Sequence, residues 1–134
     1  PIFEPHCTIY GHLNTDIEIL KPLITELAKN YNQFSASIKK IKSGDSYSKS
    51  LYVSIENSDA LNQLNTICKN KFRSSRKYGF DPHISIAYGI FSKEEIYFAT
   101  KSLIIPDHVV FNGLSIVKTG KNVKNWETVF QRQF

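Results

Sequence analysis

Two histidines of this chain each stand two residues before a hydroxyl side chain. His6 is followed by Thr8, and His83 is followed by Ser85, with apolar residues between and after them. Because side chains alternate across a β-strand, each histidine would share one face with its hydroxyl, while the apolar residues would face a core. Two such strands side by side would gather two imidazoles and two hydroxyls around one spot.

This set of side chains suits phosphoryl chemistry without a metal. An imidazole, with an ordinary pKa of about 6.5, can take a proton from water while a second imidazole gives one to a leaving alkoxide. The hydroxyls can donate hydrogen bonds to the non-bridging oxygens, where charge develops in the transition state. We therefore predict that His6, Thr8, His83 and Ser85 are catalytic, although the sequence does not decide which histidine is the acid.

The similarity between the two halves extends beyond these motifs. The histidines are 77 positions apart, and each motif continues into a tyrosine and a glycine. The stretch FSASIKKIKSG at 34–44 resembles FNGLSIVKTG at 111–120, and the two stretches end 76 positions apart. This period is too long for a solenoid, whose repeats have roughly 20–50 residues. We expect a pseudo-two-fold domain in which each half supplies one histidine.

Hydrophobic periodicity and capping residues predict alternating helices and strands. Helices are expected after the cap signals Asn14-Thr15-Asp16 and Asn57-Ser58-Asp59, and Ser92 with Glu95 forms a capping-box pattern. The predicted helices cover 17–30, 60–72 and 92–102, and the predicted strands cover 6–10, 34–42, 50–55, the segment from 83, 109–118 and 126–130.

The totals are those of one globular domain. The chain has 134 residues, 41% of them hydrophobic, with nine Phe and seven Tyr. Its net charge of +5 favours anionic partners such as phosphates or nucleic acid, with a solvated basic surface as the plain alternative. The densest basic patch lies between Lys69 and Lys77.

No apolar run approaches the ~20 residues of a membrane span, and no secretory or lipidation motif is present in the residues shown. The chain starts at Pro1 and has no Met, which indicates a processed, trimmed or partial N-terminus. Cys7 and Cys68 are too few for a disulfide scaffold, so we expect free thiols, a reducing compartment and a cytoplasmic location.

Other kinds of site fit less well. A zinc site normally needs three or four ligands, and His12 and His108 match no zinc spacing. Cys7 would face away from His6, which argues against a Cys–His nucleophile pair. A lone histidine in a strand is most often structural, but a duplicated His-x-hydroxyl motif is not readily explained by chance. We therefore predict no metal and no cofactor.

The paired motifs carry a family resemblance. His6-Cys7-Thr8-Ile9 and His83-Ile84-Ser85-Ile86 resemble the two signatures of the two-histidine (2H) phosphoesterases. Phe3-Glu4-Pro5-His6 and the segment FDPHISIAYG at 80–89 are similar to the plant and fungal cyclic phosphodiesterase branch, as are YSKSLYV at 47–53 and the late Trp126. The resemblance covers nearly the whole chain.

The resemblance implies an α+β, bilobal, duplicated fold, with two antiparallel β-sheets flanking a central cleft and helices outside. The lobes would cover roughly 1–50 and 51–134 of a single domain. Family members usually begin with a strand and a helix before the first motif, so we expect that part of the first lobe is missing from this chain or abbreviated. The implied activity is metal-independent opening of a cyclic phosphate, of the 2′,3′-cyclic nucleotide or ADP-ribose 1″,2″-cyclic phosphate type.

Four further residues are candidates for substrate binding. Tyr88 would line the pocket, and Tyr10 is its counterpart in the repeat. Lys49 stands where the resemblance to the plant enzymes implies a Gln. Trp126 could stack on a base. We expect a monomer without a membrane or stable protein partner. The alternatives are an RNA end-processing enzyme, a cyclic oligonucleotide hydrolase, or a non-catalytic nucleotide- or RNA-binding module on the same fold.

Overall fold

The computed structural model describes residues 4–134, so Phe3 of the first resembling segment lies outside the described residues. Helices, strands and two 3-10 turns follow one another in the order α1 (Ile17–Ala28), β1 (Phe34–Ser43), η1 (Tyr47–Lys49), β2 (Leu51–Ile55), α2 (Asp59–Lys71), β3 (His83–Ala87), α3 (Lys93–Ser102), β4 (His108–Phe111), β5 (Gly113–Lys118), η2 (Val123–Asn125) and β6 (Glu127–Gln133).

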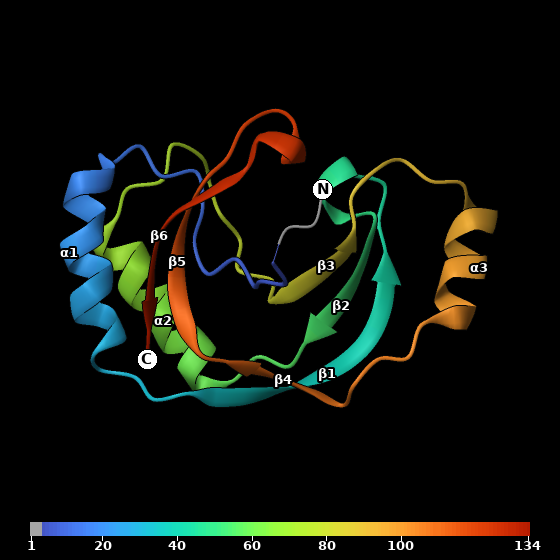
Figure 1. Cartoon of the computed structure of the whole chain (residues 1–134), viewed down its shortest axis with the longest axis horizontal. Coiled ribbons are helices and arrows are strands. Elements are labelled where there is room, and N and C mark those ends of the chain that lie inside the picture. Colours follow the sequence, from blue (N-terminus) through green and yellow to red (C-terminus); the bar gives the residue numbers. More distant parts are fainter. Residues whose placement is uncertain (1–3) are drawn as a thin grey trace.

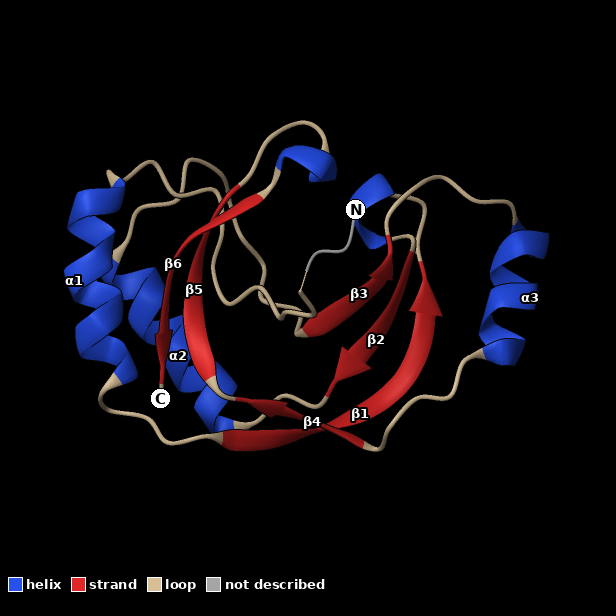
Figure 2. Ribbon diagram, viewed as in Figure 1, coloured by secondary structure: helices blue, strands red, loops and turns tan. Residues whose placement is uncertain are grey.

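The strands form two antiparallel sheets, which confirms the α+β fold class. Four strands pair in the order β3-β2-β1-β4, and β5 pairs with β6 in a second sheet. The four-stranded sheet is strongly curled, and α3 lies outside it, whereas α1 and α2 lie beside β5 and β6 (Figures 1 and 2). Helices therefore lie on the outside of both sheets, as expected.

The predicted helix starts are confirmed by their caps. The Asp16 carboxylate accepts a hydrogen bond from the Glu18 backbone N–H at the start of α1, and the Ser58 hydroxyl accepts one from Leu61 at the start of α2. Ser92 and Glu95 make both bonds of a capping box at the start of α3. No helix of the described residues is both long and apolar enough to pass through a bilayer.

Two clusters of buried side chains hold the elements together. The larger one joins α1 and α2 to the second sheet, with Leu20, Ile24 and Leu64 among its buried members. The smaller one, made by Ala36, Ile55 and Leu61, packs α2 against the four-stranded sheet. Burial of such side chains stabilises the fold by about 1.5–3 kcal/mol for each one fully buried.

The prediction of one strand over 109–118 is wrong. The segment divides at Asn112, so that His108–Phe111 pairs with β1 while Gly113–Lys118 pairs with β6 in the other sheet. A Cβ atom at Gly113 would clash with the backbone carbonyl of Arg132. The break at Asn112 therefore lets one segment supply a strand to each sheet, and the glycine permits the close approach of β6.

The prediction of a regular strand over 6–10 is also wrong. Only Cys7 forms a bridge there, with Ile84 of β3. The Thr8 carbonyl accepts a hydrogen bond from the Tyr78 hydroxyl at 2.9 Å, and the Ile9 carbonyl accepts one from the Asn65 amide at 2.7 Å. Side chains from other elements thus occupy backbone acceptors that a neighbouring strand would use.

Candidate active site

The bridge between Cys7 and Ile84 aligns the two histidine motifs. Since the pairing is antiparallel, a register continued by one residue in each direction would set His6 opposite Ser85 and Thr8 opposite His83. Side chains of directly opposed residues share a face. Cys7 and Ile84 therefore share one face of this pair. That the two histidines and the two hydroxyl residues share the other face remains a prediction, supported by the effect of the His6 charge on the pKa of His83.

The opposite face of this pair is apolar. Cys7 and Ile84 both pack against the cluster of Ala36, Ile55 and Leu61. Burial raises the pKa of the Cys7 thiol to about 11, which leaves it protonated and unreactive at neutral pH. The alternation predicted for the motifs therefore places Cys7 on the core side, as expected, whereas Ile86, which the same alternation placed there, is 37% exposed.

Both imidazoles are anchored in the same way. Nδ1 of His6 lies 2.9 Å from the Glu4 carbonyl oxygen, and Nδ1 of His83 lies 2.6 Å from the Asp81 carbonyl oxygen. A carbonyl can only accept, so each Nδ1 carries a proton and donates it. Nε2 is then the nitrogen that exchanges protons with a substrate. The repeated acidic-Pro-His sequence signalled this anchor, which our sequence analysis did not interpret.

His83 lies among β2 side chains and the end of η1. The Tyr52 ring meets it edge-on with centroids 5.3 Å apart, and the Lys49 ammonium pairs with the Asp81 carboxylate while lying 4.5 Å from the Tyr52 ring centre. Burial lowers the pKa of His83; the hydrogen bond to Asp81 opposes this effect, and the charges of Lys49 and His6 add to it. The hydrogen bond from Lys49 lowers the pKa of Asp81.

Aromatic rings surround His6. Its ring centroid lies 6.5 Å from that of Trp126, and Trp126 lies 5.9 Å from Tyr88 in an edge-on arrangement. Burial raises the pKa of Tyr88, which is hydrogen-bonded to Ser85. Two of the predicted binding residues, Tyr88 and Trp126, are therefore brought together between the two motifs.

Tyr10 and Lys49 differ in their surroundings. Tyr10 packs against the larger core cluster and meets the Tyr78 ring edge-on at 5.5 Å, a setting that suits a structural role. Lys49 is held close to His83 by its ion pair with Asp81. In its predicted contact with a substrate, the Lys49 ammonium would therefore interact with both the substrate and the Asp81 carboxylate. Both binding roles remain predictions.

Sequence reasoning missed the residues that connect η1 to the end of β3. Ser50 is 2% exposed, and its hydroxyl accepts a hydrogen bond from the Gly89 N–H at 3.1 Å. Gly89 has a φ of +155°, and a Cβ there would lie 2.8 Å from the Phe91 ring. The Ser85 hydroxyl donates to the Ser48 carbonyl at 3.1 Å. These contacts hold the YSKSLYV segment against the second motif.

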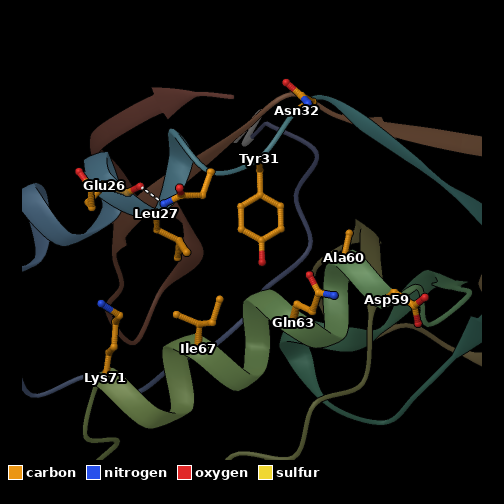
Figure 3. Close-up of a pocket in the computed structure, with 10 residues that line it drawn as sticks. Glu26, Leu27, Tyr31, Asn32, Asp59, Ala60, Gln63, Ile67 and Lys71 are labelled. Carbon is orange, nitrogen blue, oxygen red and sulfur yellow. Dashed lines mark hydrogen bonds between the residues drawn. The ribbon is translucent and has the colours of Figure 1, made fainter.

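One hollow of the described residues lies away from the histidines. It has a volume of about 610 Å³ and separates the end of α1 from α2, with Leu27, Tyr31, Gln63 and Ile67 in its lining (Figure 3). Within residues 4–134, no three His, Cys, Asp or Glu side chains gather closely enough to hold a metal ion.

The fold and the paired motifs together correspond to the 2H class of phosphoesterases. The family model of the 2′-5′ RNA ligase superfamily matches residues 3–121, and the chain belongs to this family.

Curated relatives support the same class. The chain is 22% identical to the cyclic phosphodiesterase of Arabidopsis thaliana over 138 residues, which cover 96% of this chain and 76% of that protein. It is 30% identical to a protein named "Putative phosphoesterase" from Oceanobacillus iheyensis, over 64% of this chain and 53% of that protein. A protein of the same name from Bacillus cereus is also 30% identical, over 69% and 56% of the two chains.

Proposed function

We propose that this protein is a phosphodiesterase that opens a cyclic phosphate, of the 2′,3′-cyclic nucleotide or ADP-ribose 1″,2″-cyclic phosphate type. The observation that supports this proposal is the bridge between Cys7 and Ile84, which joins the two His-x-hydroxyl segments side by side. The likeness to the Arabidopsis thaliana cyclic phosphodiesterase supports the reaction type.

The proposed reaction uses Nε2 of both histidines. One neutral imidazole accepts a proton from water at Nε2 as the water oxygen forms its bond to phosphorus. The other imidazole, initially protonated, donates its Nε2 proton to the ester oxygen as the P–O bond breaks. The products are a phosphomonoester and a free hydroxyl, and the two histidines have exchanged protonation states.

The surroundings of His83 favour it as the base. Its pKa is lowered by burial and by the nearby charges of Lys49 and His6, which keeps the ring neutral at neutral pH. His6 would then be the acid. The anchor from Nδ1 to the Asp81 carbonyl keeps the lone pair of His83 on Nε2, where the water must bind.

Thr8 and Ser85 would stabilise the charge that develops on the non-bridging oxygens. For this role the Ser85 hydroxyl turns from the Ser48 carbonyl to a phosphate oxygen. Trp126 and Tyr88 would hold the base of the nucleotide next to His6, since aromatic rings pack well on a base. Lys49 would place its positive charge beside His83, where its ammonium group pairs with the Asp81 carboxylate.

A substrate panel tests this proposal. Hydrolysis of 2′,3′-cyclic mononucleotides, ADP-ribose cyclic phosphate, cyclic oligonucleotides and RNA ends is measured with EDTA present. The proposal expects turnover of one of the first two substrates, with loss of turnover in the His6→Ala and His83→Ala variants. Turnover of RNA ends or cyclic oligonucleotides alone would assign the protein to one of the alternative hydrolases. Binding without any turnover would indicate a nucleotide-binding module.

A further inference from the structure

We infer that Lys40 and Lys42 of β1 form a subsite for a second phosphate group of the substrate. The inference rests on the proposed function for the place of the cyclic phosphate, between the two histidine motifs. For 2′,3′-cyclic nucleotides it adds a requirement that the proposed function does not contain, namely a second anionic group in the same molecule; ADP-ribose 1″,2″-cyclic phosphate already carries such a group in its diphosphate.

The pairing register places these lysines on the histidine face of the sheet. Lys42 pairs with Tyr52, which pairs with Ser85. Lys40 pairs with Ser54, which pairs with His83. Residues in register across neighbouring strands point to the same side of a sheet. Two polar rows therefore run from β1 to the histidine motifs.

The apolar residues between these two polar rows confirm which face of the sheet the lysines occupy. Ile41 pairs with Val53, and Val53 pairs with Ile84, which packs against the core cluster next to Cys7. Because side chains alternate along each strand, the lysines on either side of Ile41 lie on the opposite face from this core.

Both lysines keep their charge available. Among residues 4–134, neither makes an ion pair, whereas Lys39 pairs with Glu56 and Lys49 pairs with Asp81. The charge of Lys42 lowers the pKa of Asp81, which shows that the lysine lies near the residues that precede His83. A phosphate would find two cations here that make no ion pair among residues 4–134, the nearby Asp81 carboxylate being paired with Lys49.

The second half of the chain differs at the positions that match these lysines in the predicted repeat. The counterpart of Lys42 is Lys118, 76 positions later, and Lys118 lies opposite Glu127 in the register of the second sheet. The counterpart of Lys49 is Trp126, 77 positions later, which lies beside His6. The histidines are thus flanked by cations toward β1 and by aromatic rings toward η2.

This asymmetry orients a substrate. The base of the substrate would lie on Trp126 and Tyr88, and its cyclic phosphate would lie between the motifs. The next anionic group of the substrate would then lie on the side of β1. That strand lies two strand spacings, about 10 Å, from β3, and the lysine side chains extend over part of this distance. Lysine is a suitable point charge for a phosphate. The group is either a 5′-phosphate or the phosphodiester of a preceding nucleotide.

Binding of product-like nucleotides tests the subsite without relying on turnover. Dissociation constants of adenosine 3′,5′-bisphosphate and adenosine 3′-phosphate are measured by calorimetry. We expect the bisphosphate to bind about tenfold more tightly, and the Lys40→Met/Lys42→Met double variant to lose most of this preference. Lys118→Met, the matched control from the other half, should retain it. An equal affinity in the unaltered protein, or a preference that survives the double variant, overturns the inference.

A kinetic arm distinguishes the two sources of the phosphate. The kcat/KM values are compared for adenosine 2′,3′-cyclic phosphate, its 5′-phosphorylated form, and a dinucleotide ending in a 2′,3′-cyclic phosphate. Preference for the second compound indicates a terminal phosphate, and preference for the third indicates a phosphodiester. If none of the three is hydrolysed, the proposed function fails for these substrates, while the binding ratio still decides the subsite.

Discussion

Two adjacent residues, Cys7 and Thr8, should respond in opposite ways to substitution because they lie on opposite faces of the first motif. Thr8 is exposed on the histidine face, so Thr8→Val should change the free energy of unfolding by no more than about 0.5 kcal/mol. It removes a proposed transition-state donor, so kcat/KM should fall by about 10–10³.

Cys7→Ser should show the reverse pattern. The thiol packs against the Ala36, Ile55 and Leu61 cluster, and a hydroxyl in its place loses its hydration. The expected cost is about 1–3 kcal/mol of unfolding free energy, or a fall in Tm of about 3–5 °C for each kcal/mol in a chain of this size. The kcat/KM per folded molecule should stay near that of the unaltered protein.

Thermal unfolding and hydrolysis of adenosine 2′,3′-cyclic phosphate, measured on both variants, check this prediction. The reasoning is refuted if Thr8→Val retains full activity, or if Cys7→Ser abolishes hydrolysis in a folded protein. Either outcome would mean that the register around the Cys7–Ile84 bridge does not define the reacting face.

The remaining predictions concern pH, metals and the support of the first motif. Activity should survive EDTA; complete loss that a divalent ion restores would contradict a mechanism that uses only side chains. The profile of kcat/KM against pH should be bell-shaped between about pH 5 and 8, with the acid limb below 6.5 because the pKa of His83 is lowered. Because the pKa of His83 is lowered in the native state, the unfolded chain binds more protons than the native one near pH 6. The free energy of unfolding should therefore fall as the pH decreases through that range. His83→Ala should weaken this pH dependence, measured by urea titrations. Asn65→Leu should cost about 1–3 kcal/mol and reduce activity, because the Ile9 carbonyl loses its donor, whereas Asn62→Leu on the exposed side of α2 should do neither.

Local sequence patterns were sufficient to predict the elements that are stabilised by residues next to them in the sequence. The caps of α1, α2 and α3 lie within three residues of the groups they satisfy, so the cap segments 14–16 and 57–59 and the Ser92 capping box could be recognised in the sequence. The alternation of β1 likewise reflects its two faces. The Cys7 face was predicted for the same reason, since one apolar residue between two polar ones indicates a core position.

Contacts between distant residues were not visible in these patterns. The first motif is held by Asn65 and Tyr78, which are 56 and 70 positions away from the carbonyls they bind. Such bonds replace the ladder of a regular strand, and no local periodicity reports them. The division at Asn112 is decided by the presence of two separate sheets, although the following Gly113 was a usable signal.

The residues around the candidate site show the same limit. Tyr52 reaches His83 only through the register of β2 and β3, which the sequence alone does not fix. The Nδ1 anchors could have been inferred from the repeated acidic-Pro-His segments, because the carbonyl two residues before each histidine is a suitable acceptor. The two polar rows that begin at Lys40 and Lys42 of β1 could not be predicted from the sequence either, because their register depends on the bulge between Ile38 and Lys40.

The central claim is that His6 and His83 act as one acid–base pair on a single phosphate. The measurement is kcat/KM for adenosine 2′,3′-cyclic phosphate, with EDTA present, for His6→Ala, His83→Ala and the double variant, each shown to be folded by its melting curve. Each single variant should lose about 10²–10⁴, and the double variant should lose far less than the product of the two. Near-normal turnover in either single variant, or losses that simply multiply, would contradict the account.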